Sequence, residues 1–151
     1  MATTKGRIKA ISVSKEKGTQ KTNVPRAELK ADFGIIGDAH SGNWHRQVSL
    51  LALESIDKMI AKGAKVAPGN FAENITTEGI DLCALEIGSI LKLGTDVELE
   101  ITQFGKKCHS GCEIFEQIGD CIMPREGIFA KVVKAGAINV GDSIEVIADE
   151  N

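Results

Sequence analysis

The sequence predicts a mostly β protein, a small β-barrel decorated by a few short helices, and three observations support this fold class. Several short stretches alternate apolar and polar side chains with the period of a half-buried strand. Glycines separate these stretches, as expected for turns between neighbouring strands. One stretch, residues 53–62, instead has apolar side chains at helical spacing, and Gly63 ends that pattern.

The predicted strands follow one another along the chain with polar turns between them. A turn-rich polar stretch over residues 14–23 separates the first two, and a later apolar segment leads directly into the helix. We expect strands over residues 6–13, 26–31, 71–77, 89–93, 97–102 and 128–135, and an apolar segment over residues 47–52. The segments 87–90 and 140–144 resemble each other, because in each a glycine turn feeds a short β-branched strand.

Length and composition favour one soluble domain. The 151 residues suit a single domain over residues 1–151, with its core at about 5–147. No apolar run reaches the about 18 residues of a membrane span, and the N-terminus lacks the apolar region of a secretory signal, so we expect a cytoplasmic protein. A net charge of −3 and a single tryptophan argue against a nucleic acid partner.

The densest cluster of reactive side chains is KKCHSGC at residues 106–112, directly after a predicted strand. Cys108 lies there among cations, which lower the pKa of a thiol and so raise its thiolate fraction. The thiolate is the form that attacks, binds metal or carries a persulfide sulfur. Cys108 is therefore the candidate working thiol, whereas Cys83, in apolar surroundings, is expected to be a small buried side chain.

Two other interpretations of this cluster stay open. Zinc prefers cysteine and histidine ligands, and four such residues occur here: Cys108, His109, Cys112 and Cys121. Their spacing gives one C-x3-C pair without a matching second pair, which argues against a structural zinc site. Alternatively, Cys112 could act as a resolving thiol that forms a redox disulfide with Cys108.

A second polar cluster occupies residues 38–46. Its two histidines could form a metal or acid–base site, or the loop could be a polar surface on which Trp44 covers part of the core. Arg46 is a candidate anion clamp, because a guanidinium can bind phosphate through two parallel hydrogen bonds.

A third polar cluster lies at the edge of the strand predicted over residues 71–77. Asn70, Glu73 and Asn74 can there either hydrogen-bond a heterocycle or cap a turn.

Taken in order, these motifs resemble the MOSC domain, the C-terminal module of molybdenum cofactor sulfurases that also occurs as small stand-alone bacterial proteins. The likeness covers most of the chain, at about residues 5–146, and its motifs are specific because six of them occur in the right order. The matching stretches are GIIGDAH at 34–40, HRQVSLL at 45–51, PGNFAENI at 68–75, Ile87-Gly88, the strand leading to Cys108, and REGIFAKV at 125–132 closing on Gly136, Gly141 and Asp142.

The resemblance implies a barrel of the pyruvate-kinase-insert type and a cysteine, Cys108 in this chain, that carries sulfur or ligates molybdenum. It also implies that one cleft is lined by His40, Arg46, Asn70, Glu73, Asn74, Arg125 and Lys131. On chemical grounds, Arg46, Arg125 and Lys131 would neutralise the phosphate of the pterin cofactor. Asn70, Glu73 and Asn74 would form hydrogen bonds with the polar edge of the pterin.

Four functions follow from this resemblance and from the residues. The first is a sulfur carrier for the molybdenum cofactor, a possible sulfur transferase that receives sulfur from a separate cysteine desulfurase or other donor. The second is a carrier that delivers the cofactor to molybdoenzymes or cofactor-biosynthesis proteins. The third is a molybdenum-dependent reductase module, and the fourth a zinc-stabilised β domain without catalysis. The chain is too short for the pyridoxal-phosphate domain of the sulfurases, and no lysine has the context of a Schiff-base site.

Overall fold

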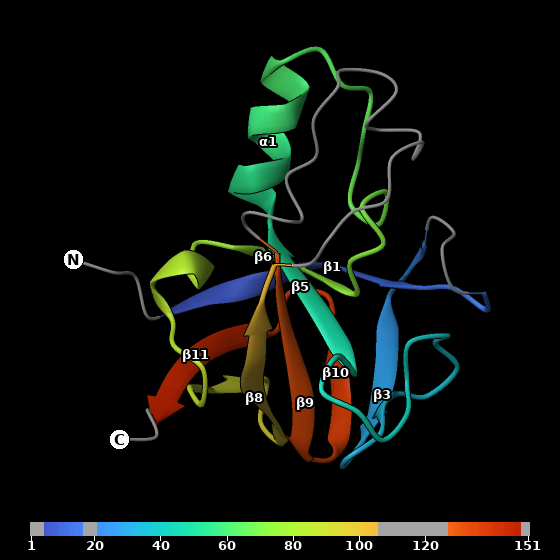
Figure 1. Ribbon diagram of the computed structural model, residues 1–151, viewed down its shortest axis with the longest axis vertical. Helices are drawn as coiled ribbons and strands as arrows, with labels where there is room; N and C mark the ends of the chain where they lie inside the picture. The colour runs from blue at the N-terminus through green and yellow to red at the C-terminus, as the bar shows by residue number, and fades with distance from the viewer. Residues whose placement is uncertain (1–4, 17–20, 106–126, 149–151) are drawn as a thin grey trace.

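A computed structural model describes residues 5–16, 21–105 and 127–148, and these residues form mostly strands (Figure 1). The described part contains one α-helix, α1 (Leu53–Ala61), and a short 3-10 turn, η1 (Leu82–Ala84). The strands are β1 (Lys5–Val13), β2 (Thr22–Val24), β3 (Arg26–Lys30), β4 (Gly34–Ile35), β5 (Val48–Ala52), β6 (Ile75–Glu78), β7 (Ile90–Leu93), β8 (Val97–Phe104), β9 (Ile128–Lys134), β10 (Gly136–Asn139) and β11 (Ser143–Ala148).

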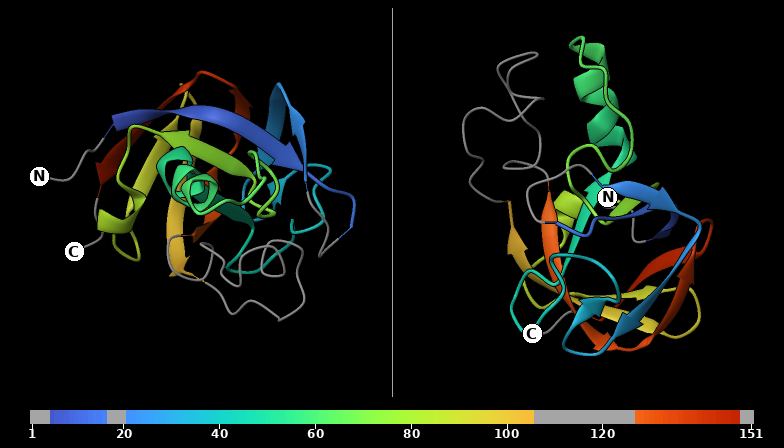
Figure 2. Two further views of the ribbon diagram at one scale, coloured as in Figure 1. Left: turned by 90° about the horizontal axis from the view of Figure 1, so that it is seen from above. Right: turned by 90° about the vertical axis from the view of Figure 1, so that its right-hand side faces the viewer.

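Seven of these strands close into a barrel, which confirms the predicted fold class. Their order is β11-β7-β8-β9-β5-β6-β1, and the pairing of β1 with β11 joins the two edges (Figure 2). The pairing of β5 with β6 is parallel, whereas the other pairings in the barrel are antiparallel. A parallel pair needs a crossover connection, and α1 lies in that connection.

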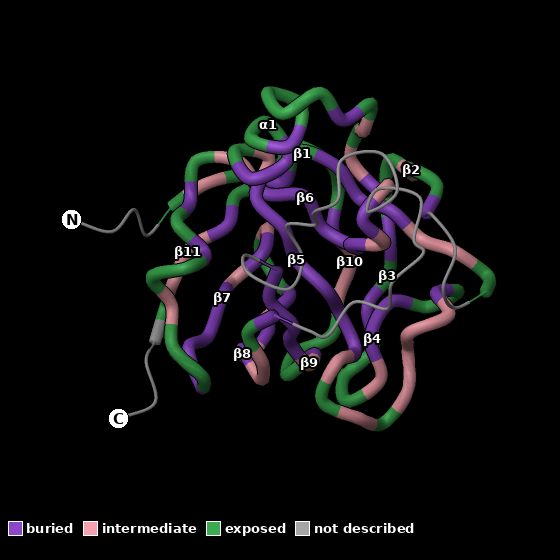
Figure 3. Tube along the Cα trace, turned by 45° about the horizontal axis from the view of Figure 1, so that its top comes forward, coloured by how far each residue is buried: buried purple, intermediate pink, exposed green. Residues whose placement is uncertain are grey.

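The interior of the barrel is filled by branched apolar side chains, which alternate with less buried residues most clearly on β8. On β8, Val97, Leu99 and Ile101 are fully buried, and the residues between them are partly exposed. Ile8 and Ile11 on β1 and Leu91 on β7 belong to the same cluster. Buried stretches run along the barrel strands (Figure 3). The burial of this apolar area is the main driving force for closing the barrel.

A second apolar cluster lies outside the barrel, beneath α1. The helix turns Ile56 and Met59 towards the barrel, and both side chains are fully buried. They pack with Leu51 of β5, Phe129 of β9 and Phe71 of the loop before β6. The helix therefore covers the outward face of β5 and β9 and stands above one end of the barrel (Figure 1).

A three-stranded antiparallel sheet, in the order β10-β3-β4, lies beside the barrel. The Asp32 N–H donates to the Val132 carbonyl at 2.8 Å and thus joins the end of β3 to β9. Asp32 has a left-handed φ of 53°, a conformation that Asp tolerates better than most residues. This sheet determines where the loop between β4 and β5 begins, and that loop carries the second polar cluster.

The structure confirms most predicted elements and corrects two predictions. The helix predicted at 53–62 is α1. The strand predicted at 71–77 begins only at Ile75, because the preceding residues form a turn in which Ala72 has a φ of 65°. Cys83, expected to be buried, is exposed, because the tight η1 turn directs its neighbour Leu82 inwards instead.

Cys83 lines a pocket of about 530 Å³ between α1 and the η1 turn. Among the described helices, none has both the length and the apolar character that crossing a membrane requires.

Candidate functional site

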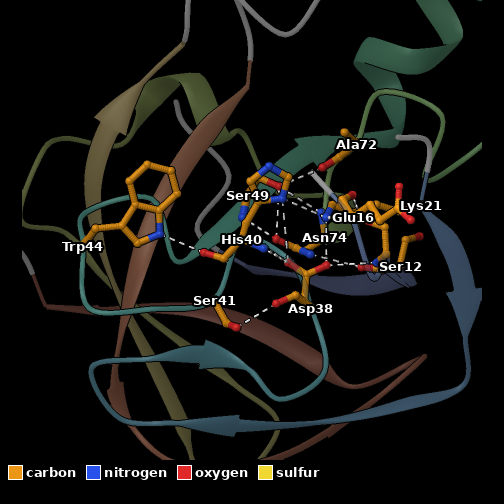
Figure 4. A network of polar contacts seen from close by, with 11 residues as sticks. Ser12, Glu16, Lys21, Asp38, His40, Ser41, Trp44, Ser49, Ala72 and Asn74 are labelled. Carbon is orange, nitrogen blue, oxygen red and sulfur yellow. Dashed lines mark hydrogen bonds and ion pairs between the residues drawn. The ribbon is translucent and has the colours of Figure 1, made fainter. Parts of the chain in front are cut away.

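The loop between β4 and β5 is anchored by a buried ion pair (Figure 4). The side chains of Lys21 and Asp38 are both 0% exposed, and Lys21 Nζ lies 2.7 Å from Asp38 Oδ1. The Lys21 ammonium also lies 3.1 Å from Ser14 Oγ and 2.9 Å from Nδ1 of His40. The His40 side chain is 24% exposed, so this cluster extends from the interior to the surface.

The environment of Asp38 favours its carboxylate form. Burial by itself raises the pKa of Asp38, but the hydrogen bond and charge of Lys21 outweigh that effect. The backbone N–H groups of Ser14 and His40 donate to the same carboxylate, and the net result is a pKa below the usual value. Asp38 is thus a buried anion with a complete set of donors.

The rest of the loop folds over this ion pair. The Trp44 indole N–H donates to the His40 carbonyl at 2.7 Å, and the Ser41 hydroxyl donates to the Asp38 carbonyl at 2.6 Å (Figure 4). The loop conformation therefore depends on backbone groups that the ion pair holds in position.

Arg46 lies close to two aromatic rings. Its guanidinium carbon is 4.7 Å from the centre of the Trp44 ring and 5.6 Å from that of Phe129. Arg46 Nε is buried, and within the described residues it has no hydrogen-bond partner. A buried donor without a partner costs about 1–3 kcal/mol, so the local packing holds Arg46 in this position against an unfavourable contribution. The adjacent Gln47 is buried and bridges the Val132 N–H, at 2.9 Å, and Asp32 Oδ1, at 3.1 Å.

His45 connects Arg46 to the end of β8. Its Nε2 lies 2.7 Å from Oε1 of Gln103, and its carbonyl accepts a hydrogen bond from the Thr102 hydroxyl. The Gln103 amide in turn donates to the Gly105 carbonyl at 2.7 Å. The Gly105 N–H donates to the Gly127 carbonyl at 2.7 Å, so residues 105 and 127 lie side by side at this rim of the barrel.

Glu73 and Asn74 form a separate network in the interior. The Glu73 carboxylate accepts hydrogen bonds from the N–H groups of Gly69 and Phe71 and from the Thr76 hydroxyl, at 2.8, 3.1 and 2.9 Å. Burial raises the pKa of Glu73, and these donors oppose that rise. Both Glu73 and Asn74 are 0% exposed.

Asn74 ties three segments together. Its Oδ1 accepts from the Ser49 N–H at 3.0 Å, and its amide donates to the Ser12 carbonyl at 3.1 Å. Glu73 therefore caps the turn, one of the two roles that the sequence left open, whereas Asn74 links segments that are distant in the chain.

The remaining predicted site residues differ in their position. Asn70 is partly exposed and its Oδ1 accepts from the Ala67 N–H at 2.9 Å, again within the turn. Lys131 lies two residues after Phe129 on β9, hence on the same outward face, with its side chain 43% exposed and 3.9 Å from Glu100. Cys108 and Arg125 lie outside the described residues, as do the zinc and disulfide alternatives at His109, Cys112 and Cys121.

The structure thus brings His40 and Arg46 together through Trp44, and it adds Lys21 and Gln103, which the sequence did not single out. Lys21 lies in a polar turn-rich stretch, where a lysine usually faces solvent, so no local signal marked it as buried. Within the described residues, no three potential metal ligands form a group.

Comparisons with solved structures support this fold. The crystal structure of YuaD from Bacillus subtilis matches with a TM-score of 0.81 and 20% identity, covering 97% of each chain. YiiM from Geobacillus stearothermophilus matches with a TM-score of 0.71 and 20% identity over 95% of this chain and 75% of that one. For YiiM from Escherichia coli the values are 0.66, 17%, 96% and 71%. A search of curated proteins gave no significant match.

The family assignment comes from the sequence rather than from these distant structures. A family model, described as the MOSC domain, matches residues 37–145. This range begins just before Asp38, includes the loop that holds His40 and Arg46, and ends in β11. Because the match spans well over half of the chain and agrees with the closed barrel, the protein belongs to the MOSC domain family.

Proposed function

We propose that this MOSC domain binds the molybdenum cofactor at Arg46 and carries sulfur for it on Cys108. A separate cysteine desulfurase or similar donor would supply the sulfur, and a molybdoenzyme or cofactor-biosynthesis protein would receive the product in the cytoplasm. When bound, the cofactor supplies a phosphate and a metal centre that accepts a sulfur ligand.

The single observation that carries this proposal is the environment of Arg46. Its guanidinium lies close to the rings of both Trp44 and Phe129, and its buried Nε lacks a partner among the described residues. Contacts with two aromatic rings restrict the guanidinium, and a restricted guanidinium loses less freedom when it binds an oxyanion. A pterin phosphate fits this donor set because it accepts charge-assisted hydrogen bonds from such a fork.

Two further side chains would help to hold the cofactor. Lys131 lies on the same outward face of β9 as Phe129 and would contribute positive charge. His40, joined to Trp44 through its carbonyl, would contribute a hydrogen bond from its partly exposed ring. Glu73 and Asn74 do not belong to this surface, because both are fully buried in the interior network.

The chain connects Cys108 to the same rim. Residue 108 follows Gly105 by three residues, and three peptide units span at most about 11 Å. Gln103 in turn joins Gly105 to His45, the neighbour of Arg46. Covalent geometry therefore limits how far the thiol can lie from the end of β8.

The sulfur-loading step is a thiol exchange. The Cys108 thiolate would attack the outer sulfur of a persulfide on the donor protein and form a new S–S bond. The S–S bond of the donor breaks, and the donor cysteine leaves as a thiolate. Cys108 then carries the persulfide, and the exchange needs no added oxidant or reductant.

Binding can be measured through Trp44, which is the single tryptophan of the chain and stacks on Arg46. We expect molybdenum cofactor, released anaerobically from a molybdoenzyme, to change its fluorescence on titration. Arg46→Gln should weaken the apparent Kd about 10-fold or more, because a lost charge-assisted hydrogen bond is worth at least about 1.5 kcal/mol.

Arg26→Gln is the matched control, since Arg26 is exposed on β3 and pairs only loosely with Glu28, at 3.4 Å. Equal affinity of Arg46→Gln and the wild type would contradict the proposed binding site.

A further inference from the structure

We infer that the buried Lys21 and Asp38 pair is a positioning device that fixes His40 as a neutral imidazole with its proton on Nε2. His40 would then present an N–H donor at the surface of the loop, without a positive charge. The tautomer follows from the contacts alone, whereas the use of this donor towards a cofactor rests on the proposed function.

The first step of the argument is the chemistry of the lysine. An ammonium group has three protons and no acceptor, so every group it bonds must accept. The acceptors of Lys21 Nζ include Asp38 Oδ1 at 2.7 Å, His40 Nδ1 at 2.9 Å and Ser14 Oγ at 3.1 Å. The Ser14 hydroxyl donates its own proton to the Glu16 carbonyl at 3.1 Å, which is consistent with its accepting role towards Lys21.

The second step is the position of the shared proton. In the alternative arrangement, the proton between Lys21 Nζ and His40 Nδ1 would lie on His40, and Lys21 would be a neutral amine. The intrinsic basicities oppose this, because a lysine amine has a pKa about 4 units above that of imidazole. Geometry opposes it as well, since Asp38 lies 2.7 Å from Lys21 Nζ but 3.8 Å from His40 Nδ1. The carboxylate therefore pairs with the lysine, and Nδ1 of His40 keeps its lone pair.

The third step follows from the ring itself. A neutral imidazole that accepts at Nδ1 must carry its proton on Nε2. The side chain is 24% exposed, and the Trp44 indole N–H holds the His40 carbonyl at 2.7 Å. The backbone and one ring nitrogen are thus both fixed, which orients the ring. A neutral N–H donor suits an oxygen or ring-nitrogen acceptor, the kind of atom found at the edge of a pterin.

The test is long-range proton–nitrogen NMR of the imidazole rings at neutral pH, on the cofactor-free protein. His40→Gln identifies the signals of His40 by their loss, and His45, exposed beside Gln103, gives a reference ring outside the Lys21 pair. We expect the His40 spectrum to show an unprotonated Nδ1 and a protonated Nε2. A proton on Nδ1 in the wild type would overturn the inference.

Two variants of Lys21 then test whether its charge orients the His40 ring or whether its side chain only fills space. Lys21→Met removes the donor and leaves Asp38 beside the ring, so we expect a proton to appear on Nδ1 of His40. Lys21→Arg keeps a donor-only cation and should preserve the wild-type pattern. If the protonation of the His40 ring in Lys21→Met equals that of the wild type, the inference is overturned. If neither variant folds, the wild-type spectrum alone tests the tautomer of His40.

This measurement is independent of cofactor binding. A wild-type Nε2–H pattern together with a failed cofactor titration would refute the proposed function and leave the tautomer assignment intact. A successful cofactor titration together with a proton on Nδ1 of His40 would support the proposed function and refute the tautomer assignment.

Discussion

At the scale of the residue, the lowered pKa of Asp38 makes one contribution to stability depend on pH. Because Lys21 holds this pKa below its usual value, the carboxylate stabilises the folded state at every pH above about 4, where the unfolded chain is also ionised. That contribution is lost as the pH falls through the lower folded-state pKa. Acid should therefore weaken the ion pair and the loop that depends on it.

Asp38→Asn tests this directly. At neutral pH we expect the variant to lose about 3–5 kcal/mol of unfolding free energy, because Lys21 remains buried without its partner. The deficit should shrink as the pH falls below about 4, since the wild type then loses the same interaction. Urea unfolding followed by Trp44 fluorescence at several pH values measures both effects.

Asp57→Asn is the control, because Asp57 is exposed on α1 and should show little deficit. A deficit for Asp38→Asn that stays constant down to strongly acidic pH would be incompatible with a lowered pKa of Asp38.

The sequence identified His40 and Arg46 but could not identify their supports. Lys21 and Gln47 become buried only because residues distant in the chain surround them, Asp38 in one case and Asp32 and Val132 in the other. A lysine in a polar stretch has no local pattern that distinguishes a solvated side chain from a buried ion pair. The residues that hold a site in position are therefore harder to predict than those that could contact a ligand.

At the scale of the element, the turn before β6 depends on Glu73. Its carboxylate satisfies the N–H groups of Gly69 and Phe71, and the Gly69 turn packs closely against the segment of Lys21. A Cβ at residue 69 would lie 2.7 Å from the Lys21 carbonyl, and its φ of 97° favours glycine. Glu73 therefore stabilises the turn against which the Lys21 segment packs.

We expect Glu73→Ala to lower the unfolding free energy by about 2–4 kcal/mol, since two buried N–H groups lose their acceptor. Asn70→Ala in the same turn removes one acceptor from the exposed Ala67 N–H and should cost less than about 1 kcal/mol. Urea unfolding at neutral pH measures the difference. Equal losses in the two variants would show that the carboxylate does not hold the turn.

The same turn explains the incorrect strand prediction at 71–77. Phe71 has the apolar character of a strand residue, but it packs outside the barrel beneath α1. Short strands were missed for a related reason. The strands β2, β4 and β10 have two to four residues each, too few for an alternating pattern to stand out.

At the scale of the whole molecule, closure of the barrel depends on the pairing of β1 with β11, which joins the two ends of the domain. The sequence predicted the fold class because local alternation and glycine turns are typical of small barrels. It could not predict the strand order, since the pairing of segments more than 100 residues apart leaves no local signal. The order of the motifs along the chain indicated the resemblance to the MOSC family, which local patterns alone could not. The family model confirms that resemblance.

The barrel also brings the termini of β8 and β9 together beside Arg46, and this arrangement supports the sulfur-carrier proposal. Gly105 and Gly127 are hydrogen-bonded to each other at 2.7 Å, and the segment with Cys108 joins them. Both ends of that segment therefore lie at the rim that carries the proposed cofactor site. Cys83, exposed beside α1, provides a natural control for any cysteine chemistry that is not specific to this rim.

The measurement that tests the central claim most directly is intact-mass spectrometry after anaerobic incubation with a cysteine desulfurase and cysteine, comparing the wild type with Cys108→Ser and Cys83→Ser. We predict a gain of about 32 Da, one sulfur, in the wild type and in Cys83→Ser, reversed by reductant and absent from Cys108→Ser. No gain in any of the three proteins, or an equal gain in Cys108→Ser, would contradict the sulfur-carrier function and leave cofactor binding at Arg46 as the role to be tested.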